Sequence, residues 1–597
     1  MAVPPDGAPA PRPGSRSGAP RRRVRRSVPD LAPWLVAVAT LALRIATAAN
    51  GPTDWDSAQY ASAVGHFDVT HGLPQPPGYW LYVEAGRWVA RLTGLGAVHA
   101  LVVVSALASA AAAGLTTVAG RDLGGRWLGI AAGAVVATSP FAWFSGSIVA
   151  TYSFDALACA LLMVLAWRAR PGSWHGVGAV VALGLLTGFR QSILQAFAVL
   201  ALLAVAAATR SWRRLALTVA AGAASLAVWF VPMVAQQPGG ASAWARATRL
   251  EADGAFQVTS VLDHAAQGRT NLGIFTAVTV VALAPVAVLA LLAGLALLVR
   301  RLVRGTGRPA ADDGAPAADD GEGRWTRPWY QGRTAVLTAA IAPPAAIVAL
   351  VQFAKGGYVL AYLPAAVIAL LLPVAALTRR VAAGRADHRR PGGRRSSIGW
   401  TVVASLGVVL VVALGTQRFV SGGGVLPQRS VRSSSALWLV EPRYQAPYAD
   451  TRHTIVSADA VDAALRGLGP SLDPSRDVVV FDTVDGGDTI FRNAGWALPD
   501  VRIALVQPGD ILYNQLHGAL YYAAGSTIAT GPAGSVFLVA SPALPGLASL
   551  TAQGYAIPVT VPQPIGGYLV WKLLPGTTVL GVRTTSHPPP FRLGTGL

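Results

Sequence analysis

Charged residues are scarce in this chain. They make up 13% of its 597 residues, about half the usual share for a soluble domain. Hydrophobic residues make up 53%, and the mean hydropathy is +0.47. Runs of roughly 18 or more apolar residues recur along the first two thirds, and each is long enough to cross a bilayer. This composition excludes an ordinary soluble protein and predicts an α-helical polytopic membrane protein.

Cysteine is nearly absent. Cys159 is the only one and lies inside a hydrophobic run, which excludes a disulfide framework or a cysteine-based metal site within one chain. Although the net charge of +20 would suit nucleic acid, its distribution argues against that partner. Arginines crowd the Pro/Gly/Ser-rich leader 1–30, which is expected to be disordered. The run Leu31–Ala49 is long for a signal peptide and lacks a clear cleavage site, so we expect a retained first helix.

Charge predicts the topology. An odd number of spans puts the N-terminus in the cytoplasm and the C-terminus outside. The predicted cytoplasmic segments hold 28 of the 48 basic residues, as the positive-inside rule requires. We therefore expect a multi-pass plasma-membrane protein with a cytoplasmic N-terminus. The eleven expected spans are 31–49, 97–120, 127–145, 151–167, 175–190, 192–209, 214–235, 273–299, 334–353, 357–377 and 398–416.

The short spans 175–190 and 192–209 leave one alternative open. Merging them into one helix would reverse the orientation of everything that follows. It would also put Arg190 and Gln191 near the middle of the bilayer, which is costly. Two separate spans are therefore preferred.

Three parts are expected: the leader 1–30, a transmembrane domain 31–416 with a first outer loop 50–96, and an extracytoplasmic mixed α/β domain 417–597. Within the transmembrane part, the acidic stretch 310–322 is expected to be a cytoplasmic linker. From about Gly422 short apolar runs bounded by turn residues replace the long spans. Strands are expected at 477–482, 501–506, 534–539 and 567–572, and helices at 458–467 and 489–498.

Two carboxylates, Asp54 and Asp56, directly follow the first span, on the predicted outer side. Asp56 is expected to cap a short surface helix over 56–64, and a capping role alone would leave Asp54 as a solvated loop acid. The alternative is catalytic: a carboxylate there could remove a proton from an acceptor hydroxyl. The stretch Pro74-Gln-Pro-Pro-Gly-Tyr79 predicts a rigid loop that could hold such groups in place.

Ionisable residues recur at the same membrane level. Asp155 lies near the outer end of the fourth span, where an acid is expensive and therefore a functional candidate, or a helix-start acid at the interface. Arg44, Arg190 and Lys355 are cations that a lipid-linked phosphate would need at that depth. Each of them could instead be a snorkelling side chain.

A metal site is the third hypothesis for this region. His66, Asp68 and His71 could bind a metal together with the acids, although their spacing is not diagnostic. The sequence requires no cofactor, and a divalent cation is left open.

Taken in order, these motifs resemble the GT-C superfamily of membrane glycosyltransferases. They are similar to the protein O-mannosyltransferase type (glycosyltransferase family 39) and to bacterial relatives such as the lipid A aminoarabinose transferases. The matching residues are Arg44, Asp56-Ser-Ala-Gln-Tyr-Ala61 and Gln75-Pro-Pro-Gly-Tyr-Trp-Leu81. Two departures are Ser57, which replaces the family's usual second acid, and Gln75, which replaces a Lys or His.

The resemblance implies roles for particular residues. Asp56 takes the place of the family's catalytic acid, with Asp54 beside it, and Asp155 resembles the second acid that opens a later helix. The stretch from Lys355 to Pro364 resembles the family's late segment near the lipid phosphate. The donor and phosphate set is completed by Arg44, Arg190, Tyr60, Gln75, Tyr79 and Tyr358.

The resulting expectation is a glycosyltransferase that moves a hexosyl or pentosyl group from a polyprenyl-phosphate donor on the outer face. Asp56 would act as the general base on an acceptor hydroxyl of a glycan, lipid or protein. The alternatives are a multi-pass transporter or flippase for a lipid-linked or envelope substrate, and a non-catalytic receptor or assembly factor. A transporter predicts internal repeats and polar residues near mid-membrane, whereas the polar residues here gather at the outer rim.

Overall fold

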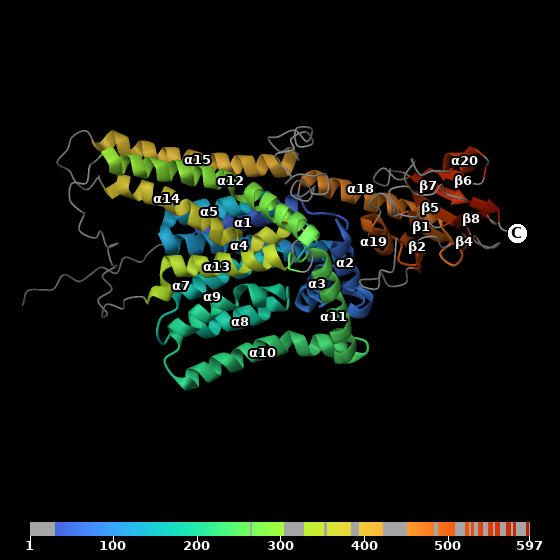
Figure 1. The fold of residues 1–597 in the computed structure, drawn as a ribbon, viewed down its shortest axis with the longest axis horizontal. Coiled ribbons are helices and arrows are strands. Elements are labelled where there is room, and N and C mark those ends of the chain that lie inside the picture. The colour runs from blue at the N-terminus through green and yellow to red at the C-terminus, as the bar shows by residue number, and fades with distance from the viewer. Residues whose placement is uncertain are drawn as a thin grey trace, which may run out of the picture. The chain divides into compact units, whose positions relative to one another are not determined.

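The computed structural model describes most of the chain from Asp30 onward, and its contacts group residues 32–597 into one unit (Figure 1). The basic leader and the acidic stretch 310–322 lie outside the described residues. The described ranges are 30–262, 265–303, 328–351, 355–383, 393–421, 451–482, 488–507, 520–523, 527–529, 535–540, 547–552, 554, 556–560, 569–574, 577–580 and 593–595.

Long apolar helices form the N-terminal two thirds. Each of the eleven expected spans falls on a helix or on a bent pair of helices, which confirms the helical polytopic class. The helices are α1 (Ala32–Ala46), α4 (Ala97–Gly124), α5 (Arg126–Thr138), α6 (Pro140–Ser147), α7 (Ser153–Arg168), α8 (His175–Thr187), α9 (Ser192–Ala208), α10 (Trp212–Gln236), α12 (Ala265–Val303), α13 (Arg333–Leu350), α14 (Leu363–Ala383) and α15 (Gly393–Ser421).

Within the described residues, five helices are long and apolar enough to cross a membrane. A sixth such span is formed if α5 and α6, which meet at a 60° bend, are taken as one. Shorter apolar helices, α1, α8, α9 and most of α14, account for further expected spans. The exact number of crossings and the orientation of the termini stay predictions.

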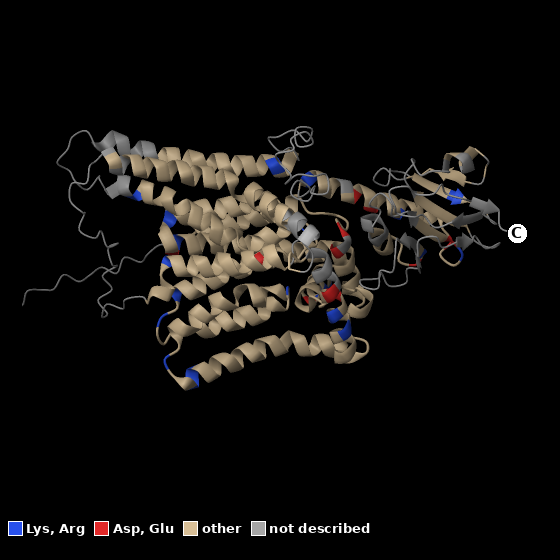
Figure 2. Cartoon of the chain, in the orientation of Figure 1, with Lys and Arg blue, Asp and Glu red and all other residues tan. Residues whose placement is uncertain are grey.

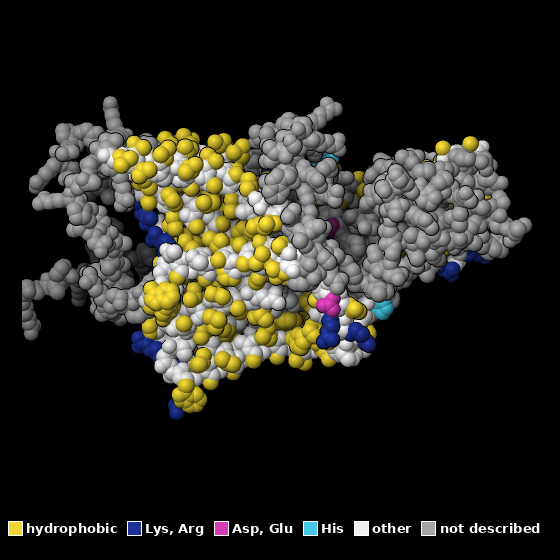
Figure 3. Space-filling view, viewed as in Figure 1, with side chains coloured by type: hydrophobic (Ala, Val, Ile, Leu, Met, Phe, Trp, Pro, Cys, Tyr) yellow, Lys and Arg dark blue, Asp and Glu magenta, His cyan; other side chains and the backbone are white. Residues whose placement is uncertain are grey.

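The surface of the bundle fits a lipid environment. Figure 3 shows hydrophobic side chains covering the visible face of the long helices. Leu217, Leu291 and Leu406, on α10, α12 and α15, are each about half exposed or more. Such a broad apolar surface would be a liability in water. In Figure 2, basic residues mark the end of the bundle where α9 joins α10, and acidic residues appear at the opposite end.

The segment 175–209 is two helices, as expected. α8 ends at Thr187 and α9 begins at Ser192, so Arg190 lies in the turn between them. The two helices pack along each other. The turn keeps the charged side chain at the end of the bundle, which avoids the cost of an arginine in the middle of a span.

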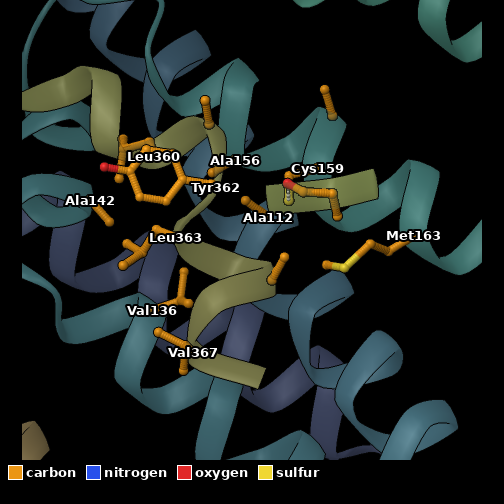
Figure 4. Close-up of a cluster of buried hydrophobic side chains, with 14 of the residues drawn as sticks. Ala112, Val136, Ala142, Ala156, Cys159, Met163, Leu360, Tyr362, Leu363 and Val367 are labelled. Carbon is orange, nitrogen blue, oxygen red and sulfur yellow. Dashed lines mark hydrogen bonds between the residues drawn. The ribbon is translucent and has the colours of Figure 1, made fainter. Parts of the chain in front are cut away.

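Short elements cover the end of the bundle that carries the acids. They are α2 (Trp55–Gly65), the 3₁₀ helix η1 (Val69–His71), α3 (Trp80–Thr93), α11 (Gly240–Thr259) and the 3₁₀ helix η3 (Gly356–Ala361), with η2 (Trp329–Gln331) elsewhere. Of these elements, η3 reaches deepest, and together with the start of α14 it is embedded in the main core. Figure 4 shows Leu360, Leu363 and Val367 among side chains of α4, α5 and α7.

The C-terminal part is the expected mixed α/β domain. Its six-stranded sheet has the order β3-β2-β1-β5-β7-β6, with β1, β2, β3 and β5 parallel and β6 and β7 antiparallel. A second sheet has the order β4-β8-β9. The strands are β1 (Val478–Asp482), β2 (Arg502–Gln507), β3 (Leu520–Ala523), β4 (Thr527–Ala529), β5 (Val536–Ala540), β6 (Ala556–Val559), β7 (Leu569–Leu573), β8 (Thr577–Leu580) and β9 (Leu593–Thr595).

Helices flank the larger sheet. Leu465 of α18 and Ala494 of α19 are fully buried in one cluster with Val479 and Phe537 of the strands. All four expected strands and both expected helices are confirmed, while the strands outside those four were not predicted. The helices are α18 (Arg452–Leu468), η6 (Gly469–Ser471), α19 (Asp488–Ala497) and α20 (Leu547–Ala552).

Candidate active site

The centre of the candidate site is an ammonium group held between two carboxylates. Lys355 Nζ lies 2.6 Å from Asp54 Oδ2 and 2.6 Å from Asp56 Oδ2. The two acids come from the start of α2, whereas the lysine immediately precedes η3. All three side chains are partly exposed. Residues about 300 positions apart in sequence thus form one charged group that a ligand can reach.

Asp54, not Asp56, caps α2, which corrects the sequence prediction. Its Oδ1 accepts the Ser57 backbone N–H at 2.9 Å and lies 2.6 Å from Ser57 Oγ. Because the helix begins at Trp55, Asp56 falls in the first turn and its carboxylate is turned to Lys355. Ser57, where the resembling family has an acid, therefore fixes Asp54 in place.

The charge state of Asp54 follows from these contacts. Burial alone would raise the pKa of its carboxyl, but the Lys355 ammonium and the hydrogen bonds from Lys355 and Ser57 outweigh that effect. The pKa of Asp54 therefore lies below its usual value. Asp54 is ionised at neutral pH and serves as the fixed counter-ion of Lys355.

η3 positions Lys355 by packing closely against the start of α7. A Cβ atom at Gly357 would lie 2.5 Å from Tyr152 Cγ, so only glycine allows this approach. Val359 and Leu360 of η3 are fully buried. The backbone of the lysine is thus anchored by a closely packed segment, and its ammonium is held by the two carboxylates.

A second ion pair lies near the first, and Tyr152 and Tyr358 interact with the cations of both pairs. Arg190 Nε lies 2.9 Å from Asp155 Oδ2, and the two side chains are only 6% and 4% exposed. Arg190 Nη1 donates to Thr151 Oγ1 at 3.0 Å. The guanidinium carbon lies 4.3 Å and 5.0 Å from the ring centres of Tyr152 and Tyr358. This cation is therefore buried, oriented on several sides and close to the Lys355 group.

Residues of the segment between α1 and α4 complete the site. The rings of Tyr60 and Tyr79 meet edge to face at 5.2 Å, and Gln75 Nε2 donates to Tyr60 OH at 3.3 Å. Burial, followed by Tyr79 and the Asp56 carboxylate, raises the pKa of Tyr60 well above its usual value. Tyr60 stays neutral beside the acids and can donate a hydrogen bond.

Tyr79 has a strained backbone. Its φ of 45° lies in the left-handed region, which bulky residues rarely adopt. Such a conformation costs of order 1–3 kcal/mol and persists only where the surroundings impose it. Trp244 Nε1 donates to Pro77 O at 3.0 Å and helps to hold this loop. The Pro-Pro-Gly-Tyr stretch thus fixes the backbone position of the tyrosine; that this loop holds catalytic groups in place stays a prediction.

Arg44 does not join this cluster. The side chain is fully buried, its Nε donates to Ser109 Oγ at 3.1 Å, and its Nη2 donates to Ala137 O at 2.6 Å. The guanidinium also lies 5.3 Å from the ring centre of Trp143. These contacts with α4, α5 and α6 hold Arg44 inside the helix bundle, where it joins helices rather than facing the acids.

The three metal candidates do not form a ligand set. Asp68 Oδ2 lies 2.6 Å from His71 Nδ1, and its Oδ1 accepts Gln237 Nε2 at 2.8 Å and the Thr70 backbone N–H at 3.0 Å. Among the described residues no group of three His, Cys, Asp or Glu side chains could hold a metal. Asp68 instead caps η1 and joins it to the end of α10.

Sequence reasoning missed the residues that orient the charged groups. Thr151 and Tyr152 contact Arg190, and Ser57 Oγ lies 2.9 Å from Val149 O. Thr151 and Tyr152 belong to the same short segment as Asp155, so their place beside a candidate acid was the available signal. Nothing in the local pattern indicates that Ser57 contacts the backbone of residue 149.

No family model matches the chain, and no curated protein does. Two crystal structures of ArnT from Cupriavidus metallidurans are similar to it, one bound to undecaprenyl phosphate and one in the apo state. Each has a TM-score of 0.47 and covers 90% of this chain and 97% of its own, with 13% and 14% identity respectively. The apo oligosaccharyltransferase of Archaeoglobus fulgidus has a TM-score of 0.38 and 13% identity, and covers 82% of this chain and 64% of its own. The function proposed below therefore rests on the site geometry and its motifs.

Proposed function

We propose that this chain is a membrane glycosyltransferase that moves a sugar from a polyprenyl-phosphate donor to an acceptor hydroxyl on the outer face. The observation that supports it most is the Lys355 ammonium between Asp54 and Asp56, beside the buried Arg190–Asp155 pair. Carboxylates that can take a proton and cations that can bind a phosphate thus lie at one end of an apolar helix bundle. The motif resemblance points to the same chemistry.

Asp56 is the general base in this proposal. Its carboxylate takes the proton of the acceptor hydroxyl while the hydroxyl oxygen attacks the anomeric carbon of the donor. The bond between that carbon and the phosphate oxygen breaks, and its electron pair stays on the leaving polyprenyl phosphate. The products are the glycosylated acceptor, a protonated Asp56 and the lipid phosphate, and the family resemblance implies inversion at the anomeric carbon.

The cations stabilise the leaving group. The phosphate gains one negative charge as the bond breaks, and Lys355 and Arg190 are the oriented positive groups of the site. Tyr60, Tyr79, Gln75 and Tyr358 line the same region and would contact the donor. Arg44 has no part in this proposal, because its contacts are inside the bundle.

Donor binding also frees the base. While Lys355 Nζ lies 2.6 Å from Asp56 Oδ2, the ammonium occupies the carboxylate oxygen that an acceptor hydroxyl would have to reach. A donor phosphate competes for the same ammonium through charge-assisted hydrogen bonds. As Lys355 turns to the phosphate, Asp56 is released and Asp54 remains the lysine's counter-ion.

The topology expected from the sequence implies the donor class. The outside of a cell lacks nucleotide sugars, so a transferase acting there needs a lipid-linked donor. The sugar is a hexose or a pentose, and the acceptor a glycan, lipid or protein. The proposal requires no metal to neutralise the charge on the phosphate, because the side chains of Lys355 and Arg190 are both cationic.

A transfer assay with a matched pair of lysine variants tests this function. The protein in nanodiscs would be mixed with a panel of radiolabelled polyprenyl-phosphate hexoses and pentoses, and with cell-envelope material as acceptor. We expect label to move to the envelope fraction, with release of an equal amount of polyprenyl phosphate. Lys355→Met should lower the rate by about 10²-fold or more, because one group that stabilises developing charge is removed.

Lys572→Met is the matched control, since Lys572 lies on β7 of the C-terminal sheet and should leave the rate unchanged. If the protein in liposomes instead moves the labelled donor across the membrane intact, with no release of polyprenyl phosphate, the chain is a transporter and the proposal is wrong. Equal rates for the two lysine variants would overturn the role of Lys355.

A further inference from the structure

A three-residue turn, Asn50–Pro52, leads from the first helix to the acids and is held by the C-terminal domain. Asp459 of α18 accepts two backbone N–H groups through Oδ1, that of Asn50 at 2.8 Å and that of Gly51 at 3.0 Å. Its Oδ2 accepts Asn50 Nδ2 at 2.9 Å. One carboxylate therefore receives three hydrogen bonds from two consecutive residues of the outer loop.

α19 and a close approach of α18 complete the contact. Asn493 of α19 is only 2% exposed, and its Nδ2 donates to Pro52 O at 3.0 Å. A Cβ atom at Gly51 would lie 2.7 Å from Asp462 Cβ, so a glycine is needed for the domain to come this near. Every residue of the turn is thus contacted by the domain.

The turn is fixed on its other side as well. The Ala49 backbone N–H donates to Ser147 O of α6 at 2.8 Å. The turn therefore lies between the helix bundle and the C-terminal domain, and Thr53 and Asp54 follow it directly. Only Thr53 and Asp54 separate the turn from the first residue of α2, so a displacement of residues 50–52 would be expected to move Asp54 and Asp56.

We infer that Asp459 and Asn493 are positioning residues, and that one role of the C-terminal domain is to hold the acids of the first outer loop in their working geometry. The catalytic part of this inference rests on the proposed function. A misplacement of about 1 Å by a change away from the chemistry can lower a rate by about 10²-fold. The domain acts through the turn and touches neither donor nor acceptor in this scheme.

An exchange of hydrogen-bonding partners tests the contact. Asp459→Ala removes all three bonds, and Asn50→Asp alone sets two carboxylates against each other. In the double variant Asn50→Asp/Asp459→Asn, Oδ1 of the new asparagine still accepts both backbone N–H groups, and its Nδ2 donates to the new carboxylate. Both single variants should therefore weaken the contact between residue 459 and the turn, and the double variant should restore it.

Two measurements are made on each full-length variant in nanodiscs. Hydrogen exchange followed by mass spectrometry reports the protection of peptides covering residues 47–60. The transfer assay with the labelled donor panel reports the maximal rate and the KM for the donor. Asp473→Ala is the control, since Asp473 is exposed in the same domain and bonds to Ser475.

We expect Asp459→Ala and Asn50→Asp to speed exchange over 47–60 and to lower the maximal rate about tenfold or more, with the donor KM within twofold. The double variant should return both values to within about threefold of the native chain. Unchanged exchange in Asp459→Ala, or singles that the double variant does not rescue, would overturn the inference. Faster exchange with a native rate would overturn its catalytic part.

A failure of the proposed function can be told apart from a failure of this inference. If Asp56→Asn transfers sugar at the native rate, the general-base assignment falls. The exchange data and the partner swap still decide whether the domain holds the turn.

Discussion

The Arg190–Asp155 ion pair both stabilises the fold and orients a cation in the candidate active site. Removing a charge from water is expensive, and the attraction of a buried pair repays this only with good geometry and further hydrogen bonds. Thr151 and the rings of Tyr152 and Tyr358 supply such contacts for Arg190. Arg190 is therefore a buried, oriented cation near the partly exposed Lys355.

Replacing one member of this pair should be strongly destabilising. Arg190→Gln leaves the buried Asp155 carboxylate without its cation, which typically costs about 3–5 kcal/mol. We expect a clear loss of thermal stability in detergent. The double variant Arg190→Gln/Asp155→Asn should recover much of the stability but not the transfer activity. An unfolding temperature of Arg190→Gln equal to that of the native chain would contradict this account.

At this scale the sequence identified most of the ionisable residues that the structure brings together, but not all of their contacts. Asp54, Asp56 and Lys355 were placed at one membrane level from the ends of their spans, but their direct contact with one another was not predicted. The cap of α2 was placed two residues late, since Asp54 and Asp56 are equally good capping residues. Arg44 was placed in the phosphate set because depth along a span does not show which way a side chain points.

The 3₁₀ helix η1 is stabilised by the carboxylate of Asp68. Asp68 joins η1 to the end of α10 through Thr70, His71 and Gln237. Burial alone would raise the pKa of Asp68, but hydrogen bonds from these three residues and the charge of His71 lower it from 3.8 to about 2. Asp68 therefore stabilises the fold in its ionised form.

The sign of the pH dependence follows. Because the pKa is lower in the folded than in the unfolded chain, the stabilisation is fully present above about pH 4 and is lost as the pH falls toward about 2. A shift of this size corresponds to about 2 kcal/mol. Asp68→Asn should lower thermal stability at pH 7, and its difference from the native chain should shrink at pH 3.

Asp253→Asn is the control for that comparison, because Asp253 is exposed on α11. A difference between Asp68→Asn and the native chain that is the same at pH 7 and pH 3 would show that the carboxylate's charge is not the cause.

Elements with a strong repeating pattern were predictable, and short ones were not. The strands β1, β2, β5 and β7 have compact apolar runs that local pattern identifies. β6 contains Pro558, and β4 and β9 have three residues each, so their place in a sheet depends on pairing with distant strands. The turn at Arg190 was predictable because a charge inside a span is costly.

For the whole molecule, the orientation in the membrane can be tested with single cysteines. Cys159 is buried and would be replaced by serine. Trp174 precedes α8 and Ala252 lies on α11, and both positions are exposed. Three expected spans separate them, so a cysteine at 252 should react with an impermeant maleimide in intact cells. A cysteine at 174 should react only after permeabilisation.

Labelling at 174 but not at 252 in intact cells would show the reverse orientation. Labelling at both positions would mean that 175–209 crosses the membrane only once. Either result would remove the basis for an outer-face reaction, because Asp54 and Asp56 lie at the same end of the bundle as the turn at Arg190.

The rate of sugar transfer by Asp56→Asn in a single turnover tests the central claim most directly. With donor and acceptor saturating, the rate should fall about 10²- to 10⁴-fold, the usual contribution of a placed general base. Donor binding should change little, and Asp500→Asn, an exposed acid of the C-terminal domain, should transfer at the native rate. Transfer by Asp56→Asn at the native rate would contradict the account.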